Sequence, residues 1–158
     1  MPIDFYKKEC QTETKSDLFG ICDDEDLDKK VPAYLDFIDE KKWIATVINN
    51  YRRDIIFTAI DHCVFLNSIE SRCDGMLECS NSIIFVELKN KSRAVTQAEQ
   101  LENTIRFVGI EKEEYVFKKA YLSNKRKQVS DYLHKDKKDQ FLTNTGFRLY
   151  FSSEIVIE

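Results

Sequence analysis

Three charged residues, Asp74, Glu87 and Lys89, stand at the ends of two predicted strands and have the types needed for metal-assisted hydrolysis. Residues 83–88 are an apolar run of branched and aromatic residues, which is typical of a buried strand, and residues 72–79 are predicted to form the strand before it. Because side chains alternate along a strand, Glu87 and Lys89 are expected to point to the same face of the sheet.

The connection between these strands, residues 79–82 with the sequence CSNS, has the small polar residues of a tight hairpin. A loop of either two or four residues sets Asp74 opposite Glu87. Two carboxylates that face each other on one sheet surface repel unless a proton or a cation lies between them. Magnesium, which takes oxygen ligands and keeps several waters, fits such a pair. Lys89, one pleat further along, could then position a water molecule.

These residues resemble the signature of the PD-(D/E)XK, or restriction-endonuclease-like, nuclease superfamily: an acid, a short hairpin, and then acid-x-lysine at the end of an apolar strand. The matching residues are Asp74 and Glu87-Leu88-Lys89, and Cys73 stands where the superfamily often has proline. The resemblance implies that Asp74 and Glu87 bind Mg²⁺ or Mn²⁺, with the backbone carbonyl of Leu88 as a further ligand. It also implies that Lys89 assists the attacking water.

Each part of this motif also has a structural explanation. Glu-x-Lys at a strand end is commonly an exposed ion pair, and Asp74-Gly75 alone is an ordinary turn signal. The combination of facing acids with the helix pattern that follows favours the metal site.

After residue 91 the pattern changes to helical spacing, with one apolar stripe that is expected to pack on the sheet. The stripe consists of Ala94, Ala98, Leu101, Ile105 and Val108. Gln97 and Gln100 lie beside it and are either exposed glutamines or functional ones. Several branches of the superfamily carry a glutamine on this helix near the phosphate, so the resemblance implies a catalytic role for Gln97 and a nucleic-acid contact for Gln100. Lys91 and Arg93 are candidates for contacts with the nucleic-acid backbone.

Two further acids are minor candidates for the site. Asp61 ends a predicted strand, residues 55–60, where an aspartate is more often a cap or turn former. Glu40 resembles an extra acid that some superfamily members carry upstream.

The predicted fold is α/β, with a central mixed β-sheet flanked by helices, for which the resemblance implies a restriction-endonuclease-like core. A chain of 158 residues with 42% apolar residues suits one domain, residues 1–158. The strand predicted at 117–123 follows a helical crossover and should run parallel to 83–88.

The chain is expected to have three parts. Residues 1–40 form an acidic arm or cover, in which a helix near Asp23 is one alternative and residues 32–39 are a short helix or extended. Residues 43–124 form the core, in which strands 43–49 and 55–60 make a hairpin. Residues 125–158 form a basic helix, 126–141, and a terminal strand, 147–157.

Cysteine usage and hydropathy predict the compartment. Five cysteines without a C-x2-C pair predict reduced thiols, and neither a disulfide framework nor a zinc site. No secretory leader opens the sequence, and no run approaches the roughly 18 apolar residues of a membrane span. We therefore expect a cytoplasmic protein without a membrane segment.

The net charge of −4 counts against a nucleic-acid partner, but basic residues gather in the last third of the chain. They are Lys118, Lys119, Lys125, Arg126, Lys127, Lys135, Lys137 and Lys138. A solvated helix face explains such a run equally well.

The motif predicts a metal-dependent nuclease that hydrolyses phosphodiester bonds, with DNA as the favoured substrate. The alternatives are a non-catalytic nucleic-acid-binding module and a protein-interaction member of the same fold, such as an immunity or regulatory protein. The sequence is compatible with a homodimer and does not determine the oligomeric state.

Overall fold

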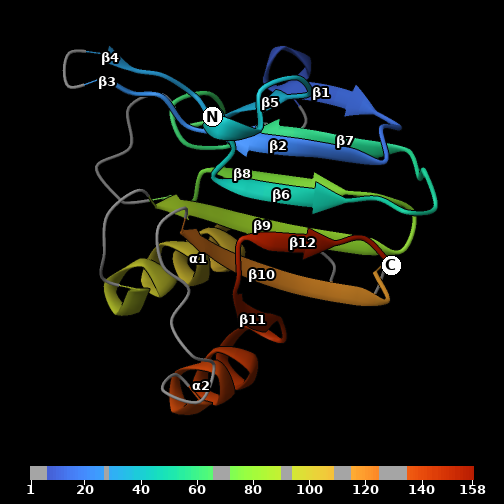
Figure 1. The fold of residues 1–158 in the computed structure, drawn as a ribbon. Coiled ribbons are helices and arrows are strands. Elements are labelled where there is room, and N and C mark those ends of the chain that lie inside the picture. Colours follow the sequence, from blue (N-terminus) through green and yellow to red (C-terminus); the bar gives the residue numbers. More distant parts are fainter. Residues whose placement is uncertain (1–6, 27–28, 66–71, 90–93, 109–114, 125–134) are drawn as a thin grey trace.

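A six-stranded and a four-stranded β-sheet, stacked face to face, form the centre of the computed structural model, with helix α1 on the outer face of the larger sheet and α2 below β11 (Figure 1). The structure describes residues 7–26, 29–65, 72–89, 94–108, 115–124 and 135–158.

The larger sheet is mixed, as expected for an α/β fold. Its first four strands are antiparallel neighbours and its last three are parallel. In spatial order the strands are β1 (Gln11–Thr14), β7 (Ile55–Ala59), β8 (Gly75–Glu78), β9 (Ser82–Lys89), β10 (Phe117–Asn124) and β11 (Arg148–Phe151). The predicted parallel pairing of β10 with β9 is confirmed.

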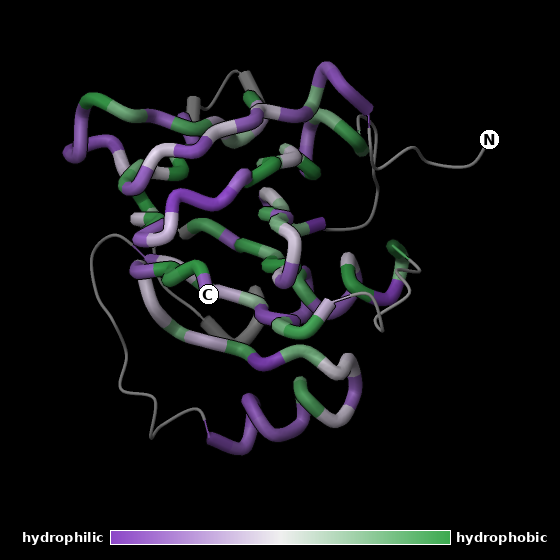
Figure 2. The backbone as a smooth tube through the Cα atoms, turned by 90° about the vertical axis from the view of Figure 1, so that its right-hand side faces the viewer, coloured by the Kyte–Doolittle hydropathy of each residue, from purple (hydrophilic) through white to green (hydrophobic). Residues whose placement is uncertain are grey.

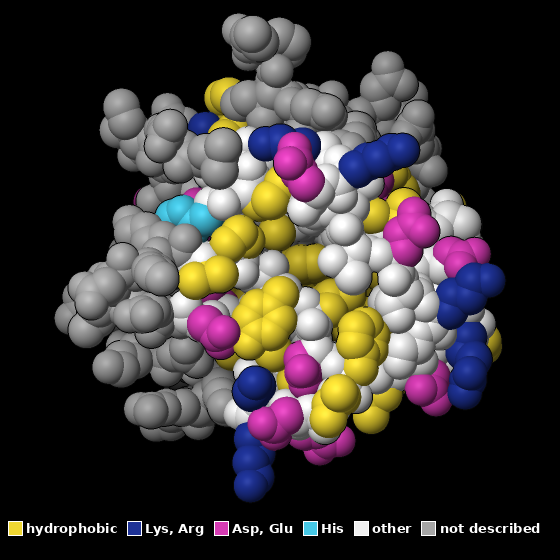
Figure 3. Space-filling view, turned by 90° about the horizontal axis from the view of Figure 1, so that it is seen from above, with side chains coloured by type: hydrophobic (Ala, Val, Ile, Leu, Met, Phe, Trp, Pro, Cys, Tyr) yellow, Lys and Arg dark blue, Asp and Glu magenta, His cyan; other side chains and the backbone are white. Residues whose placement is uncertain are grey.

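The smaller sheet covers one face of the larger one. Its strands are, in spatial order, β12 (Glu154–Val156), β6 (Ala45–Ile48), β2 (Leu18–Cys22) and β5 (Tyr34–Asp36). Phe19 and Val47 of this sheet are buried together with Phe57 and Val86 of the larger sheet. Viewed onto the edge strands β1 and β5, apolar side chains gather at the centre, with carboxylates and cations around them (Figure 3).

Helix α1 (Ala94–Val108) covers the opposite face of the larger sheet. Ala98, Leu101 and Ile105 of the predicted stripe are at most 3% exposed and pack with Phe85 of β9, which confirms the predicted helix face. Helix α2 (Lys135–Thr145) lies against β11 and is mostly hydrophilic (Figure 2). No helix in these ranges has the length and apolarity to cross a membrane.

The sequence predicts that the helix corresponding to α2 spans residues 126–141. In the described residues α2 starts at Lys135, and residues 125–134, which include three of the basic residues, lie outside the described ranges. Phe141 is its main buried side chain, and Gly146 supplies the turn to β11 with a φ of 79°.

The hairpin predicted between β6 and β7 is wrong. The two strands lie in different sheets, although both show the expected alternation. The reason is Asn49, which is fully buried: its amide Nδ2 donates hydrogen bonds to the carbonyl oxygens of Ser16 and Arg53, at 3.1 and 3.0 Å. These bonds hold the end of β6 near the start of β2, and the chain after Asn49 then enters the larger sheet as β7.

The helix expected near Asp23 is also wrong, because Glu25–Asp26 (β3) and Lys29–Lys30 (β4) form a hairpin. Residues of opposite charge occupy facing positions in that hairpin. The segment expected to be an arm or cover also contributes β1 to the larger sheet and β2 to the smaller one. Of the two alternatives for residues 32–39, the extended one is confirmed by β5.

The terminal strand predicted over 147–157 is two strands in two sheets. The chain leaves the larger sheet after β11 and joins the smaller one as β12. Ser152 makes the break, since its hydroxyl accepts a hydrogen bond from the amide of Glu154 at 3.1 Å, and the amide of Thr46 then binds the carbonyl of Ser153 at 2.7 Å.

The expectation of reduced thiols is wrong for two of the five cysteines. Cys10, just before β1, forms a disulfide bond with Cys63, which follows β7, and their Cα atoms are 5.8 Å apart. The antiparallel pairing of β1 with β7 brings the two segments together. Cys22, Cys73 and Cys79 are free. The cytoplasmic compartment stays a prediction, and this bond counts against it, because disulfides are rare in reducing compartments.

Candidate functional site

Asp74 and Glu87 belong to the β8–β9 hairpin, whose predicted register is confirmed. The turn is closed by two backbone hydrogen bonds between Cys79 and Ser82, of 3.0 and 3.3 Å. Gly75 pairs with Val86, and the same register places Asp74 opposite Glu87. Glu87 lies on the same face of β9 as the buried residues that pack under α1, so the Asp74–Glu87 pair lies on the α1 side of the sheet.

The carboxylate of Asp74 reaches across to β9. The backbone amide of Leu88 donates a hydrogen bond of 2.7 Å to its Oδ2, and the amide of Ile60 on β7 donates one of 3.0 Å to its backbone carbonyl. Asp74 is half-buried and is held from both neighbouring strands. A single rotamer is therefore favoured, as a metal ligand requires.

Glu87 is 1% exposed, which is rare for a carboxylate. Burial raises the pKa of the neighbouring Cys73 thiol well above its usual range, and the negative charges of Glu87 and, more weakly, Asp74 raise it further. The two acids and this thiol therefore share one small, poorly solvated region, in which a cation would be strongly attracted to the acids.

Helix α1 is attached to the strand at this point by the hydroxyl of Thr104. This oxygen accepts a hydrogen bond from the Cys73 amide at 2.8 Å and donates one of 2.8 Å to the carbonyl of Gln100. The amide oxygen Oε1 of Gln100 is buried and has no hydrogen bond to any described residue. Gln100 thus lies one helical turn before Thr104, which contacts Cys73. Cys73 is the residue directly before Asp74.

Gly75 allows the ring of Phe57 to lie against β8 directly behind Asp74. A β-carbon at this position would come within 2.7 Å of the Phe57 ring carbon Cζ, closer than real β-carbons approach. We expect Gly75→Ala to lower the free energy of unfolding by about 1–3 kcal/mol, because the aromatic core would have to shift. Urea denaturation measures the loss, with Ser80→Ala in the exposed hairpin turn as the control; equal midpoints for the two variants would contradict this packing.

The minor candidates fall in different places. Asp61 follows Ile60, the residue whose amide bonds the carbonyl of Asp74, and its Oδ2 lies 3.2 Å from Nε2 of His62. Glu40 is exposed in a short turn after β5, in the layer that covers the other face of the larger sheet. The structure places Asp61 beside the β7 residue that bonds Asp74 and places Glu40 in the other layer.

The remaining predicted residues are described in part or not at all. The backbone of Lys89 pairs with Asn124 of β10, but its side chain lies outside the described residues, as does the side chain of Gln97 on α1. Lys91 and Arg93 lie outside them altogether. The predicted roles of these four residues stay predictions.

Sequence reasoning missed Arg72, two residues before Asp74. Its side chain is 4% exposed, and its guanidinium lies 4.8 Å from the ring centroid of Phe65 and 4.5 Å from that of Phe107 on α1. A cation between two rings fixes the strand that leads into Asp74. Phe65 precedes Arg72 by seven residues and Phe107 follows it by 35, so no pattern within the strand indicated the contact.

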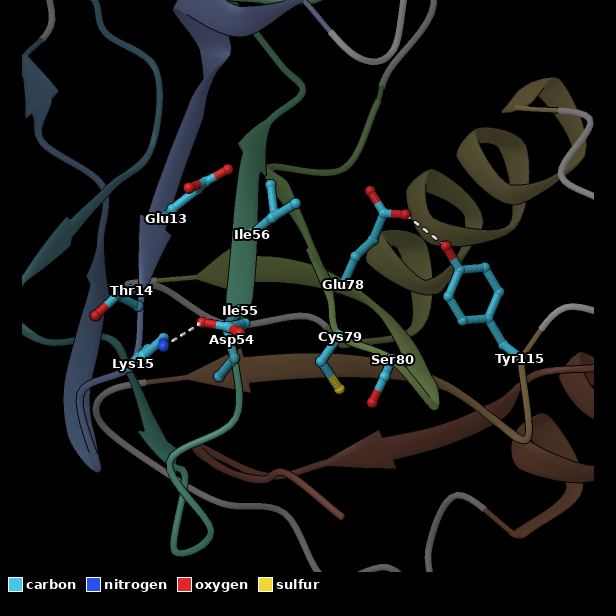
Figure 4. Close-up of a pocket in the computed structure, with 10 residues that line it drawn as sticks. All are labelled: Glu13, Thr14, Lys15, Asp54, Ile55, Ile56, Glu78, Cys79, Ser80 and Tyr115. Carbon is cyan, nitrogen blue, oxygen red and sulfur yellow. Dashed lines mark hydrogen bonds and ion pairs between the residues drawn. The ribbon is translucent and has the colours of Figure 1, made fainter.

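A cavity of about 700 Å³ lies on the same face but at the opposite end of β8 (Figure 4). Glu13 and Glu78 point up from the sheet with Ile56 between them, and the hydroxyl of Tyr115 donates a 2.6 Å hydrogen bond to Glu78. Glu78 is four residues along β8 from Asp74, or about 13 Å. The cavity is therefore separate from the Asp74–Glu87 pair.

The oxygen donors near Asp74 fit magnesium better than a metal that needs a full protein cage. Within the described ranges, no group of three or more histidine, cysteine, aspartate and glutamate side chains could hold a metal ion. Magnesium commonly uses only one or two carboxylates and completes its shell with water and substrate phosphates. Asp74, Glu87 and the carbonyl of Leu88 suit that kind of site.

A scan against protein-family models and searches of curated proteins and of solved structures found no match to this chain. Membership of the nuclease superfamily therefore stays a prediction from the motif.

Proposed function

We propose that the protein is a metal-dependent nuclease that hydrolyses phosphodiester bonds, with DNA as its substrate. The observation that carries the proposal is the β8–β9 register, which sets Asp74 opposite Glu87 and places Lys89 two residues further along the same strand. Two acids and a lysine in this order are the signature of the PD-(D/E)XK superfamily.

The surrounding elements support a restriction-endonuclease-like core. Three antiparallel strands, β7, β8 and β9, are followed by α1 on one face and by β10 parallel to β9. The motif residues lie at the beginning of β8 and the end of β9, on the face that α1 covers. A mixed sheet with these acids beside the helix is the arrangement that the resemblance implies.

The residues divide the chemistry between them. Asp74 and Glu87 would hold Mg²⁺ or Mn²⁺, with the Leu88 carbonyl as a further ligand. The ion would supply positive charge to stabilise the negative charge that develops on the phosphate. Lys89 would position the attacking water or help to deprotonate it, and Gln97 or Gln100 would orient the phosphate through an amide.

One observation favours a non-catalytic member of the fold. Glu87 is 1% exposed, whereas Asp74 is half-buried, so a substrate would have to approach the site from the Asp74 side chain. In that case the acids would be retained in a nucleic-acid-binding or protein-interaction module.

Incubation with nucleic acids distinguishes these functions. Purified protein is mixed with plasmid, linear duplex and single-stranded DNA and with RNA, each with magnesium, manganese or chelator. The nuclease proposal expects cleavage that requires the divalent ion. Binding to nucleic acid without cleavage under every condition would support the non-catalytic module instead.

A further inference from the structure

A second cavity, of about 310 Å³, lies between β10, β11 and the end of α2. The lining residues that matter here are Phe117, Lys119, Arg148, Tyr150 and Glu158. Two aromatic rings, two cations and one carboxylate thus meet in a space at the lower end of the roughly 300–1,000 Å³ typical of small-ligand sites.

The charges in this cavity do not cancel. Lys119 is 7% exposed, and its Nζ lies 2.6 Å from Oε1 of Glu158, so this pair is neutral overall. Arg148 occupies the position next to Lys119 on the neighbouring strand and is exposed. Arg148 makes no ion pair with a residue in the described ranges. An anion entering the cavity would therefore meet the uncompensated guanidinium of Arg148.

The aromatic rings are held in place around these cations. Tyr150 stacks on Tyr121 with ring centroids 4.9 Å apart and planes 17° from parallel. Nζ of Lys119 lies 5.6 Å from the Phe117 ring centroid and 5.8 Å from that of Tyr150, and Lys138 of α2 is also 5.8 Å from the latter. Flat apolar surfaces next to cations suit a ligand that combines a planar ring with a negative group.

We propose that this cavity binds a nucleotide unit, with its base against Phe117 and Tyr150 and its phosphate at Arg148. The nucleotide belongs either to a nucleic-acid strand or to a free nucleoside phosphate, since both present the same ring and anion. Lys119 and Glu158 form the polar wall between base and phosphate. The volume of about 310 Å³ admits one such unit.

The site is separate from the Asp74–Glu87 pair. Lys119 pairs in register with Ile84, whose side chain lies in the core between the two sheets, on the face opposite α1. Ile84 precedes Glu87 by three residues, or about 10 Å along β9. Nucleotide binding here does not require the proposed nuclease activity.

The test is binding in the presence of chelator, using full-length protein that carries Glu87→Gln so that no metal or cleavage contributes. Calorimetry measures thymidine 5′-monophosphate, thymidine and inorganic phosphate, and fluorescence anisotropy measures a labelled ten-nucleotide oligothymidine. We expect the monophosphate to bind more tightly than thymidine or phosphate. Arg148→Gln should weaken binding about tenfold by removing a charge-assisted hydrogen bond. Tighter binding of the oligonucleotide assigns the site to a strand, and equal affinity assigns it to a free nucleotide.

The control is Lys15→Gln, which removes an equal charge from an exposed lysine that is 3.4 Å from Asp54, at the other edge of the sheet. This variant should bind like the parent protein. The inference is overturned if phosphate binds as tightly as the monophosphate, if Arg148→Gln binds like the parent, or if Lys15→Gln weakens binding equally. Arg148 is exposed, so Arg148→Gln is expected to fold, and circular dichroism verifies this.

Discussion

Glu87→Gln should reduce metal-dependent cleavage of DNA at least about 1,000-fold, a loss of roughly 4 kcal/mol of transition-state stabilisation. The substitution keeps the shape of a side chain that is 1% exposed, so packing around β9 is preserved while the charge that holds the metal is lost. Asp74→Ala and Lys89→Ala should have comparable effects. Gln97→Ala should reduce cleavage less, because an amide supplies a hydrogen bond and not a ligand.

The matched control is Glu78→Gln. Glu78 lies on β8, on the same face of the sheet as Asp74, but at the opposite end of the strand and hydrogen-bonded to Tyr115. This variant should cleave like wild type. Full activity in Glu87→Gln, or an equal loss in Glu78→Gln, would place the chemistry elsewhere.

Loss of the Cys10–Cys63 disulfide should lower the free energy of unfolding by about 4 kcal/mol. The bond joins residues 53 positions apart, and a closed loop of that length removes much of the conformational entropy of the unfolded chain. Because whole domains are stable by about 5–15 kcal/mol, this is a large share of the total. Urea denaturation of the Cys10→Ser, Cys63→Ser double variant measures it.

Cys79→Ser serves as the control for the disulfide prediction, since Cys79 is free and half-buried in the β8–β9 hairpin. Reductant should destabilise wild type and Cys79→Ser equally and leave the double variant unchanged. If the double variant and wild type unfold at the same urea concentration without reductant, the bond does not form in solution.

Local patterns were enough to predict the part of the fold that carries the motif. The β8–β9 hairpin, its register, the apolar face of α1 and the parallel pairing of β10 all follow from periodicity and from turn residues within a short stretch of chain. Facing positions in a tight hairpin depend only on loop length, so the pairing of Asp74 with Glu87 could be worked out from numbering alone.

Contacts between distant segments could not be predicted in this way. Alternation in β6 and β7 is the same whether they pair with each other or lie in two sheets, and the bond from Asn49 to Ser16 decides between these arrangements. The disulfide likewise depends on β1 lying beside β7, which no cysteine spacing indicates.

The same limit applies around the candidate site. The hydroxyl of Thr104 joins α1 to Cys73 beside the acids, a contact that helical spacing does not indicate. Arg72, between the rings of Phe65 and Phe107, gave no signal at all. Residues that bind are visible in a motif, whereas residues that hold them in place depend on the folded chain.

Thermal unfolding of wild type and Asp74→Asn, with and without manganese, tests most directly whether Asp74 and Glu87 form a metal site. Asparagine can still accept the hydrogen bond from the Leu88 amide, so the variant removes the charge and keeps the local structure. Without metal, Asp74→Asn should melt at or above wild type, because it relieves the repulsion between facing carboxylates.

Added manganese should raise the melting temperature of wild type, by an amount equivalent to about 2.7 kcal/mol when the free ion reaches 100 times its dissociation constant, and should leave Asp74→Asn nearly unchanged. If Asp74→Asn instead melts well below metal-free wild type, and manganese shifts neither protein, Asp74 is a structural residue and the metal site does not exist.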